Sequence, residues 1–253
     1  MVLDWPPWFM LQEDKGMGQF NHILKEAQQN LPQYDHINEE MNWSRFWYEI
    51  ENTNMCYVFG LKSSKREELV YFSNPHTLIL PNAIIMRKED IKKLGNPARY
   101  SIGELTQDPR FIGLVEKERS FTKPIDTVLS KFKDGSNLTR VEKNSESLIK
   151  MLIAGRIDYT IEYPNVASYH TKTQNIDTDT LVSIQISEMA QFSYVHMACT
   201  KNAWGKKIIN EWNEILRRLK PTEKYRNIIE TGYSHESELK VLRENYYNFI
   251  KAQ

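Results

Sequence analysis

Arg66 has the side-chain chemistry to hold a small anion. It lies in the segment SSKREELVYFS, shortly after an apolar run that ends at Leu61. A guanidinium group presents a rigid fork of N–H donors that matches the two oxygens of a carboxylate. The alternative is a solvated charge at a helix end, because Lys65, Glu67 and Glu68 surround it. The chemistry of Arg66 thus makes it a candidate to bind a ligand carboxylate.

Aromatic rings flank a proline pair near the start of the sequence, in the stretch DWPPWF. Prolines cannot continue a helix or a central strand, so we expect a rigid turn just after a strand that ends at residues 2–5. Trp5 is predicted to stack on a ligand, which would contribute about 0.5–2 kcal/mol. Trp8 is a second candidate for ligand contact, although at least one of Trp8 and Phe9 is expected to pack in the core.

Two further pairs of side chains could reach a ligand from the second half of the chain. Arg119 and Ser120 in EKERSF follow a predicted strand, where a helix start would offer amide groups to an anion. A solvated charge run is the alternative for this pair. Glu162 and Tyr163 in TIEYP end another predicted strand, in which neighbouring side chains point to opposite faces. The alternation makes one of these two a candidate to face a ligand and leaves open which one.

Other residue types give no metal, dinucleotide or nucleophile signature. The six histidines form no HxxxH or HExxH pair, and Gly16-Met17-Gly18 lacks the third glycine of a dinucleotide-binding turn. We therefore expect no metal and no cofactor. Cys56 and Cys199 have no neighbouring base in the sequence, and we expect two buried thiols. A single bridge between them is the alternative, since a sequence cannot place two Cα atoms within bridging distance.

The elements that would position these groups alternate between amphipathic helices and short apolar strands. In the first part of the chain, the patterns predict a helix from Phe20 that stops before Pro32, a strand over 34–42, a helix over 43–52, and a buried parallel strand over 55–61. An extended segment over 78–86 is interrupted at Pro81. Further along, strands are predicted at 111–118, 138–142, 157–164 and twice between 180 and 202, and helices at 124–132, 145–154, 203–220 and 236–253. Gly155 takes the place of a glycine at a helix C-terminus.

This alternation predicts the α/β class, with two α/β lobes joined by two crossing strands. We expect residues 1–83 plus 191–253 to form the first lobe and residues 84–190 the second. Ligands in open α/β folds bind at the carboxyl ends of strands, which would place a ligand cleft between the lobes.

Composition limits the classes of partner. The chain has 33 basic and 33 acidic residues, so its balanced charge gives no reason to expect nucleic acid or an anionic membrane. No apolar run approaches the roughly 20 residues that span a bilayer. Because residues 2–5 already read as the end of a strand, we expect a signal peptide to precede this sequence in the natural chain.

Four stretches, in their order and spacing, resemble the type 2 periplasmic solute-binding proteins. They are WPPWF, GMGQFNHIL, LKSSKREELVYFSNP and AGRIDYTIEYP, and the resemblance covers nearly the whole chain. The nearest branch contains the polar-amino-acid binders of bacterial ABC importers. The resemblance implies a periplasmic protein in which two α/β lobes close over a small solute, with no catalytic activity and with an ABC permease as partner.

The resemblance also assigns residues in the first lobe. Trp5 takes the place of an aromatic residue that stacks on the ligand, and Arg66 that of the arginine that binds the ligand carboxylate. The backbone of Phe59, Gly60 and Leu61 would line the cleft.

In the second lobe, the resemblance places small hydroxyl residues at a helix start, where this chain has Arg119 and Ser120. One position departs from the pattern. The aspartate that holds the ammonium group of an amino-acid ligand is replaced by Tyr163, and Glu162 precedes it. The expected ligand is therefore an α-amino acid, another carboxylate-bearing solute or an aromatic solute.

The sequence thus predicts a monomeric extracytoplasmic protein that captures a small carboxylate-bearing solute for an ABC importer or a sensor. One alternative is an enzyme on the same scaffold, such as a dehydratase, with Glu162 as its acid or base. Another is a sensory ligand-binding domain without a transport role.

Overall fold

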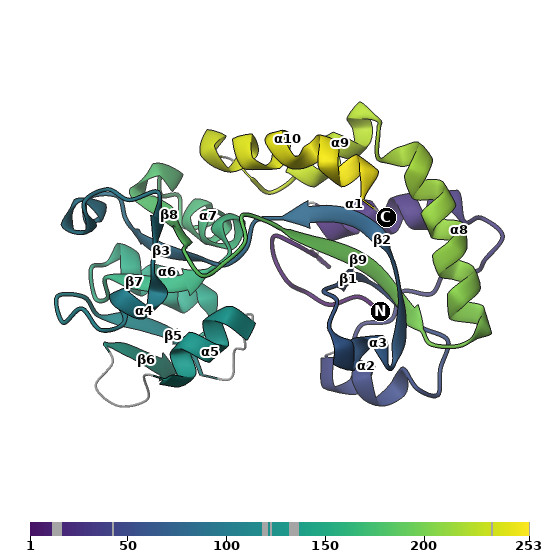
Figure 1. Ribbon diagram of the computed structural model, residues 1–253, viewed down its shortest axis with the longest axis horizontal. Helices are drawn as coiled ribbons and strands as arrows, with labels where there is room; N and C mark the ends of the chain where they lie inside the picture. The colour runs from purple at the N-terminus through teal and green to yellow at the C-terminus, as the bar shows by residue number, and fades with distance from the viewer. Residues whose placement is uncertain are drawn as a thin grey trace. The chain divides into compact units, whose positions relative to one another are not determined.

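The chain divides into two compact α/β units. The computed structural model describes residues 1–11, 17–41, 43–117, 121, 123–131, 137–233 and 235–252. Unit 1 comprises Met1–Ile79 and Phe192–Gln253, and unit 2 comprises Leu80–Gln191 (Figure 1). The predicted α/β fold of two lobes with two chain crossings is confirmed. The crossings lie after residues 79 and 191, where the sequence placed them after residues 83 and 190.

Unit 1 is built on a three-stranded antiparallel sheet in the order β1-β9-β2. Its strands are β1 (Cys56–Gly60), β2 (Val70–Ile79) and β9 (Ser193–Thr200). Its helices are α1 (Gln19–Asn30), α2 (Trp43–Glu49), α3 (Ser64–Glu67), α8 (Ala203–Leu219), α9 (Glu223–Glu230) and α10 (Glu236–Lys251) (Figure 1). The central strand, β9, joins the unit just after the second crossing, so it brings a late segment of the chain between two early ones.

Helices cover the sheet of unit 1 through apolar stripes. On α8 the buried apolar residues recur every three to four positions, and this stripe packs along β2 and β9. Phe46 and Ile50, on and just after α2, pack against Tyr57 and Ala198 of the sheet. Because neighbouring strand residues face opposite sides, both faces of this sheet are buried.

Unit 2 is built on a six-stranded mixed sheet in the order β4-β8-β3-β7-β5-β6. Its strands are β3 (Ala83–Arg87), β4 (Arg99–Tyr100), β5 (Gly113–Glu116), β6 (Leu138–Val141), β7 (Tyr159–Glu162) and β8 (Leu181–Ile186). Its α-helices are α4 (Ile102–Leu105), α5 (Lys123–Lys131), α6 (Ser145–Ile153) and α7 (Pro164–Lys172), with 3₁₀ turns η2 at Ile91–Leu94 and η3 at Thr178–Thr180. Strand β3 runs antiparallel to both β7 and β8, whereas β5 runs parallel to β6 and β7.

Strand β3 shows how the sheet of unit 2 is sandwiched. Ile84 and Met86 belong to a core cluster that includes residues of α4 and α5. Ala83 and Ile85, which point to the other face, belong to a second cluster with residues of α6 and α7. The predicted helix-terminal glycine is confirmed, since Gly155 follows α6 with a φ of +69°. Three layers of helix, sheet and helix result.

Three local predictions are wrong. Residues 34–42 form no strand in their described part, where only Glu40 makes an isolated bridge, to Val2. Residues 35–40 are all exposed, so this segment has no buried face to fix it in a sheet. Residues 2–5 likewise contain isolated bridges at Val2 and Trp5 rather than a strand end. Strand β1 was predicted to be parallel, but it pairs antiparallel with β9.

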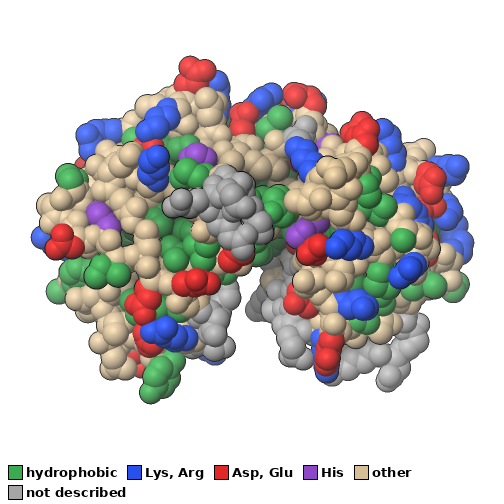
Figure 2. Space-filling model, turned by 180° about the vertical axis from the view of Figure 1, so that it is seen from behind, with side chains coloured by type: hydrophobic (Ala, Val, Ile, Leu, Met, Phe, Trp, Pro, Cys, Tyr) green, Lys and Arg blue, Asp and Glu red, His purple; other side chains and the backbone are tan. Residues whose placement is uncertain are grey.

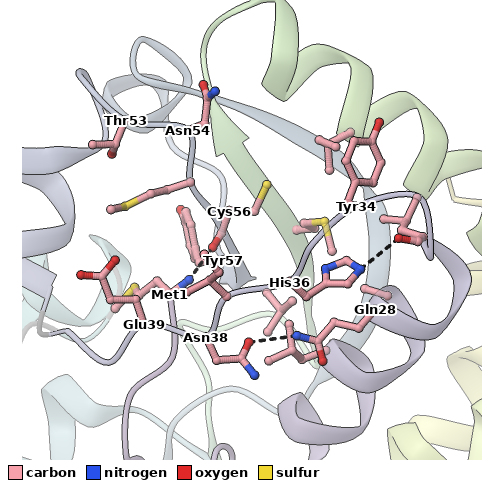
Figure 3. A pocket seen from close by; sticks show the side chains of 18 of the residues that line it. Met1, Gln28, Tyr34, His36, Asn38, Glu39, Thr53, Asn54, Cys56 and Tyr57 are labelled. Atoms are coloured by element: carbon pink, nitrogen blue, oxygen red, sulfur yellow. Dashed lines mark hydrogen bonds between the residues drawn. The ribbon is translucent and has the colours of Figure 1, made fainter.

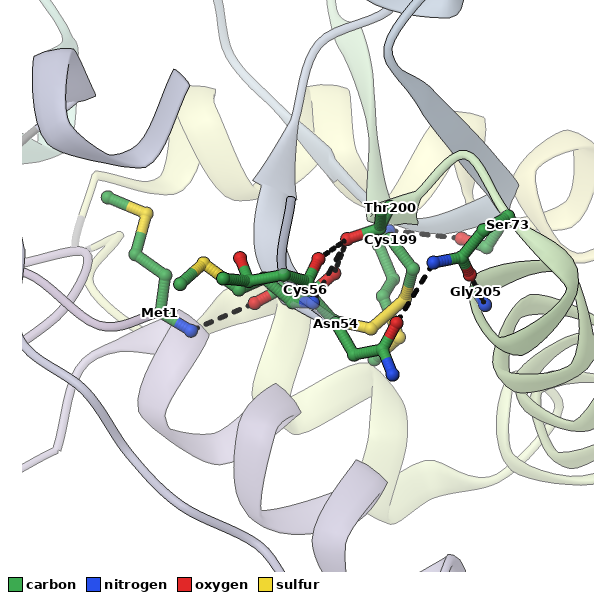
Figure 4. Close-up of a disulfide and its surroundings, with 11 residues drawn as sticks. Met1, Asn54, Cys56, Ser73, Cys199, Thr200 and Gly205 are labelled. Carbon is green, nitrogen blue, oxygen red and sulfur yellow. Dashed lines mark hydrogen bonds between the residues drawn. A yellow bond between two sulfur atoms is a disulfide. The ribbon is translucent and has the colours of Figure 1, made fainter. Parts of the chain in front are cut away.

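The expectation of two free thiols is also wrong, because Cys56 and Cys199 form a disulfide (Figure 4). The two residues face each other across the β1–β9 ladder with their Cα atoms 4.1 Å apart. They are 143 residues apart in the chain, so the bridge, which was the alternative to two thiols, depends on a strand pairing that no local pattern indicates. The closed loop contains all of unit 2, so the bond fastens the two ends of a long insertion.

We predict that replacing both cysteines by alanine lowers the free energy of unfolding by about 4–5 kcal/mol, the scale for closing a loop longer than 100 residues. The loss arises because the unfolded chain regains the conformations that the cross-link removes. Urea unfolding with and without a thiol reductant measures it. Equal midpoints for the oxidised and reduced protein would contradict the prediction.

Two buried histidines lie on the strands that carry the crossings. His76 on β2 is fully buried with its ring edge-on to Trp212 of α8, and His196 on β9 lies next to the backbone carbonyl of Ser73, 2.7 Å from Nδ1. Burial, followed by the charge of Lys62, lowers the pKa of His196 to about 4. Burial also lowers the pKa of His76 well below its ordinary value, with the neighbouring charge of His196 second. Both rings are therefore neutral in the folded protein near pH 7.

We predict that unit 1 loses stability as the pH falls from 6.5 toward 4. The unfolded chain takes up protons on these imidazoles below about pH 6.5, whereas folded His196 resists protonation down to about pH 4, so His196 alone accounts for roughly 3 kcal/mol. The free energy of unfolding, measured across this range, should fall less in His196→Gln than in the parent. Identical pH profiles for the two proteins would rule out this assignment.

Candidate functional site

The aromatic turn near the start of the chain is held by its own backbone. The N–H of Trp5 donates to the carbonyl of Phe9 at 2.8 Å, and the N–H of Phe9 donates back at 2.9 Å. The start of α1 closes against this turn at Gly18. A Cβ atom there would lie 2.1 Å from the carbonyl oxygen of Pro7, so no larger residue fits without a shift of the backbone. The prolines thus form part of a fixed platform.

The two tryptophans of this turn have different fates. Trp8 is fully buried, stacked on Phe20 with ring centroids 5.5 Å apart and edge-on to Tyr233. Its ring serves the core of unit 1 and has no exposed face for a solute. Trp5 is half-buried and meets the ring of Phe59 edge-to-face at 4.5 Å. Trp5 is therefore the tryptophan of this pair with surface left for a ligand.

The carboxyl end of β1 brings three predicted residues next to this turn. Phe59 is half-buried beneath Trp5, and Gly60 lies close to β9. A Cβ atom at Gly60 would lie 2.6 Å from the carbonyl oxygen of His196. The close approach of the two strands therefore requires glycine here. Leu61 follows the strand and offers its carbonyl to the next segment.

Arg66 lies on the short helix α3, which Ser63 caps by accepting the N–H of Arg66. Its Nη1 donates to the carbonyl of Leu61 at 2.9 Å, and its guanidinium carbon lies 5.6 Å from the ring centre of Trp47 on α2. Nε and Nη2 make no hydrogen bond or ion pair within the described part of the chain. These two nitrogens share one edge of the guanidinium, which is the edge that grips a carboxylate with two parallel bonds.

The field around Arg66 favours an incoming anion. The nearby phenol of Tyr57 has its pKa raised by burial, and the positive charge of Arg66 acts in the opposite direction. Tyr57 is therefore neutral near pH 7 and does not offset the guanidinium charge. A half-buried cation without a described carboxylate partner attracts an anion more strongly than a cation in bulk water would.

In unit 2, Glu162 and Tyr163 lie where β7 meets α7. The side chain of Glu162 is 3% exposed, and it accepts hydrogen bonds from the hydroxyl of Ser145 and, at 2.7 Å, from the N–H of Tyr163. Tyr163 is the N-cap residue of α7 and is also buried. Helix α7 was not predicted, because Pro164 reads as a strand end although proline is favoured in the first turn of a helix. Arg119 and Ser120 lie outside the described residues.

Three residues that the sequence analysis did not select support these groups. They are Trp47, which lies beside the guanidinium, Ser63, which caps α3, and Ser145, which donates to Glu162. Ser63 has a recognisable signal, since serine before a short polar helix is a common cap. Trp47 and Ser145 are brought in by tertiary packing, for which the sequence carries no local signal.

The described residues show neither a metal site nor a membrane-spanning helix. No group of three or more His, Cys, Asp or Glu side chains among them could hold a metal ion. Their helices fall short of the length and apolar character needed to cross a bilayer. On the faces seen in Figure 2, basic and acidic side chains are interspersed on each unit, without a large patch of one sign.

Comparisons with known proteins give matches among solved structures. No protein-family model matches the chain, and no curated protein matches it. A mutant of ArgBP from T. maritima is 20% identical, with 90% of this chain and 93% of that chain covered and a TM-score of 0.60. The probable amino-acid ABC transporter extracellular-binding protein ytmK from Bacillus subtilis is 14% identical over the same shares, with a TM-score of 0.69.

A third match is a histidine kinase sensor domain with similarity to periplasmic binding proteins. It is 15% identical, covers 90% of this chain and 93% of that chain, and has a TM-score of 0.60. At these identities the likeness is one of fold.

We predict that the two tryptophans of the turn differ in their effect on stability. Trp8→Ala should lower the free energy of unfolding by about 3–5 kcal/mol, because it empties a filled core position. Trp5→Ala should cost about 1 kcal/mol, mainly its edge-to-face contact with Phe59. Urea unfolding of the two variants tests this, and equal losses would show that the assigned roles are mistaken.

Proposed function

We infer that this chain, whose fold is that of the type 2 periplasmic binding proteins, is an extracytoplasmic solute-binding protein. The proposed ligand is a small solute with a carboxylate group, an amino acid or a related compound. The proposed partner is the permease of an ABC importer. The domain bounds follow the two compact units, with the first crossing after residue 79 and the second after residue 191.

The observation that carries this proposal is the free edge of Arg66. One nitrogen of the guanidinium is fixed to the carbonyl of Leu61, and the aromatic ring of Trp47 lies beside it. The side chain is thus oriented before any ligand arrives, which reduces the entropy lost on binding. Nε and Nη2 have no partner among the described residues, so a carboxylate can replace water there without displacing a protein group.

Aromatic surface next to β1 supports the same assignment. Trp5 and Phe59 form an edge-to-face pair in which both rings are half-buried. An apolar or planar part of a solute could rest against Trp5 while its carboxylate meets Arg66. We propose Trp5, Phe59, Gly60, Leu61 and Arg66 as the recognition residues of unit 1.

The contributions of unit 2 are proposed with different roles. Tyr163 stands where the resemblance places an acidic residue, and it remains a predicted ligand residue although it is buried, with 8% of its surface exposed. Glu162 already accepts two hydrogen bonds, from Ser145 and from the backbone, which favours a role in holding the start of α7. Arg119 and Ser120 remain predicted ligand residues. These assignments favour a solute whose binding does not require a protein carboxylate to hold an ammonium group of the ligand.

An enzymatic role has less support than binding. Glu162 is the residue for which the sequence allowed an acid or base function, and its two oxygens are occupied within the protein. The described solved structures that share the fold are binding proteins and a sensor domain. The sensor domain makes sensing a second candidate function, in which the solute-loaded protein acts on a signalling partner instead of a permease.

We predict that a thermal-shift screen with free amino acids, small mono- and dicarboxylates and short peptides yields a carboxylate-bearing hit. A ligand at 100 times its Kd should stabilise the protein by about 2.7 kcal/mol. Arg66→Ala should weaken the hit by about 30-fold or more, because a hydrogen-bonded charge pair is lost. Isothermal titration calorimetry measures the change.

The matched control is Arg218→Ala, which removes an exposed arginine of α8 in the same unit. It should bind the hit with the affinity of the parent. Arg66→Lys should recover only part of the lost affinity, since an ammonium group keeps the charge but not the fork. A hit that Arg66→Ala binds as tightly as the parent would refute the role of Arg66.

A further inference from the structure

A cavity that Arg66 does not line lies within unit 1. It has a volume of about 460 Å³ and is lined by α1, the segment 31–41, the residues around the start of β1, and the first turns of α8 (Figure 3). This is a size typical of small-molecule sites, which range over about 300–1,000 Å³. Trp5, Phe59 and Arg66 are not among its lining residues. It therefore needs its own explanation.

Part of the cavity lining consists of apolar side chains that adapt their shape. Met41 and Met197 are buried in its wall, Met55 is half-buried, and Trp204 offers a half-buried indole from α8. Methionine side chains adapt to the shape of a guest, and their sulfur atoms make favourable contacts with aromatic rings. An indole face also attracts cations. These residues suit a flat, apolar guest that carries a positive charge.

The rim of the cavity is acidic. Asp35, Glu39 and Glu49 line it, and its described lining contains no lysine or arginine. The amino group of Met1 is a positive group in the lining, and it interacts with Glu39. Arg45 lies close by and bonds both Glu39 and Glu49, at 2.7 and 2.6 Å. Asp35 is exposed and has no hydrogen bond or ion pair within the described ranges. One carboxylate is thus left for a guest.

The remaining polar groups of the cavity are mostly satisfied within the protein. Gln28 donates to Asn38 at 2.9 Å, and Nε2 of His36 lies 2.9 Å from the carbonyl of Leu31 (Figure 3). The amino group of Met1 donates to the carbonyl of Cys56, and burial lowers its pKa. The side chains that define a ligand are therefore the apolar part of the lining and the acidic rim.

From this combination we propose that the cavity is a binding site for a small organic cation with an aromatic body, such as an arylalkylamine. The ring lies against Trp204 and the methionines, and the ammonium group lies at the rim near Asp35. This ligand class differs from the anionic solute proposed for Arg66.

The test uses tryptamine and the matched alcohol tryptophol, which have the same ring and differ in the ammonium group. Neither carries a carboxylate, so neither meets the requirement of Arg66. Calorimetric titration should show saturable binding of tryptamine, about fivefold tighter than tryptophol, on the scale of one exposed ion pair. Absence of saturable tryptamine binding, or equal affinity for the two compounds, overturns the proposal.

A substitution at the rim tests the role of charge. Asp35→Asn should weaken tryptamine by about fivefold and leave tryptophol unchanged. Glu244→Gln, which removes an exposed acid on α10, is the matched control and should change neither affinity. Circular dichroism confirms that each variant is folded. Equal tryptamine affinity in the rim variant and in the control counts against the proposal.

The disulfide provides a reporter of where the probe binds. Cys56 is half-buried and lines the cavity, whereas its disulfide partner Cys199 is fully buried, so we expect a small thiol to attack at Cys56. Figure 4 shows the bond between the two residues. Saturating tryptamine should slow the reduction of the disulfide by dithiothreitol by about fivefold or more, following the fraction of sites occupied. A reduction rate that saturating tryptamine leaves unchanged would place the probe elsewhere and overturn the assignment.

Discussion

The pairing of β9 with β1 and β2 is the constraint on which unit 1 depends. β9 arrives from far along the chain, and its two antiparallel ladders hold β1 on one side of it and β2 on the other. The disulfide between Cys56 and Cys199 fastens one of these ladders. The end of β1 is fixed as a result, and Leu61 there anchors the guanidinium of Arg66. The position of the proposed ligand group is therefore set by a long-range strand pairing.

The charged side chains Arg66 in unit 1 and Glu162 in unit 2 differ in how far the protein satisfies their hydrogen bonds. In unit 1, Arg66 is held by a neutral carbonyl and has no described acidic partner, so part of its hydrogen-bonding capacity is left for a guest. In unit 2, Glu162 is buried with donors on both oxygens, as a carboxylate in the interior must be. Solute recognition requires a charged group with hydrogen-bonding capacity left over, as at Arg66. Structural stability requires a buried charge whose hydrogen bonds are satisfied, as at Glu162. This contrast explains why an arginine, and not the glutamate, is the centre of the proposed function.

Local patterns in the sequence were sufficient for most elements but not for their partners. The apolar run at β1, the amphipathic stripe of α1 and the glycine after α6 each carry their signal within a few residues, and all three were predicted correctly. The alternation at 34–42 also suggested a strand, yet the described part of this segment pairs with no strand and makes one isolated bridge, between Glu40 and Val2. The disulfide and the buried pair His76 and His196 depend on β9, whose pairing no local pattern encodes. For the candidate site, the family resemblance singled out Arg66 and its chemistry agreed, while the division of roles between Trp5 and Trp8 required tertiary packing.

The most direct test of the account is a crystal structure of the protein with the carboxylate-bearing ligand from the screen. The account predicts that both carboxylate oxygens lie within about 3 Å of Nε and Nη2 of Arg66, with Nη1 still bonded to the carbonyl of Leu61. A ligand whose carboxylate is bound elsewhere, with Nε and Nη2 of Arg66 facing water, would contradict it.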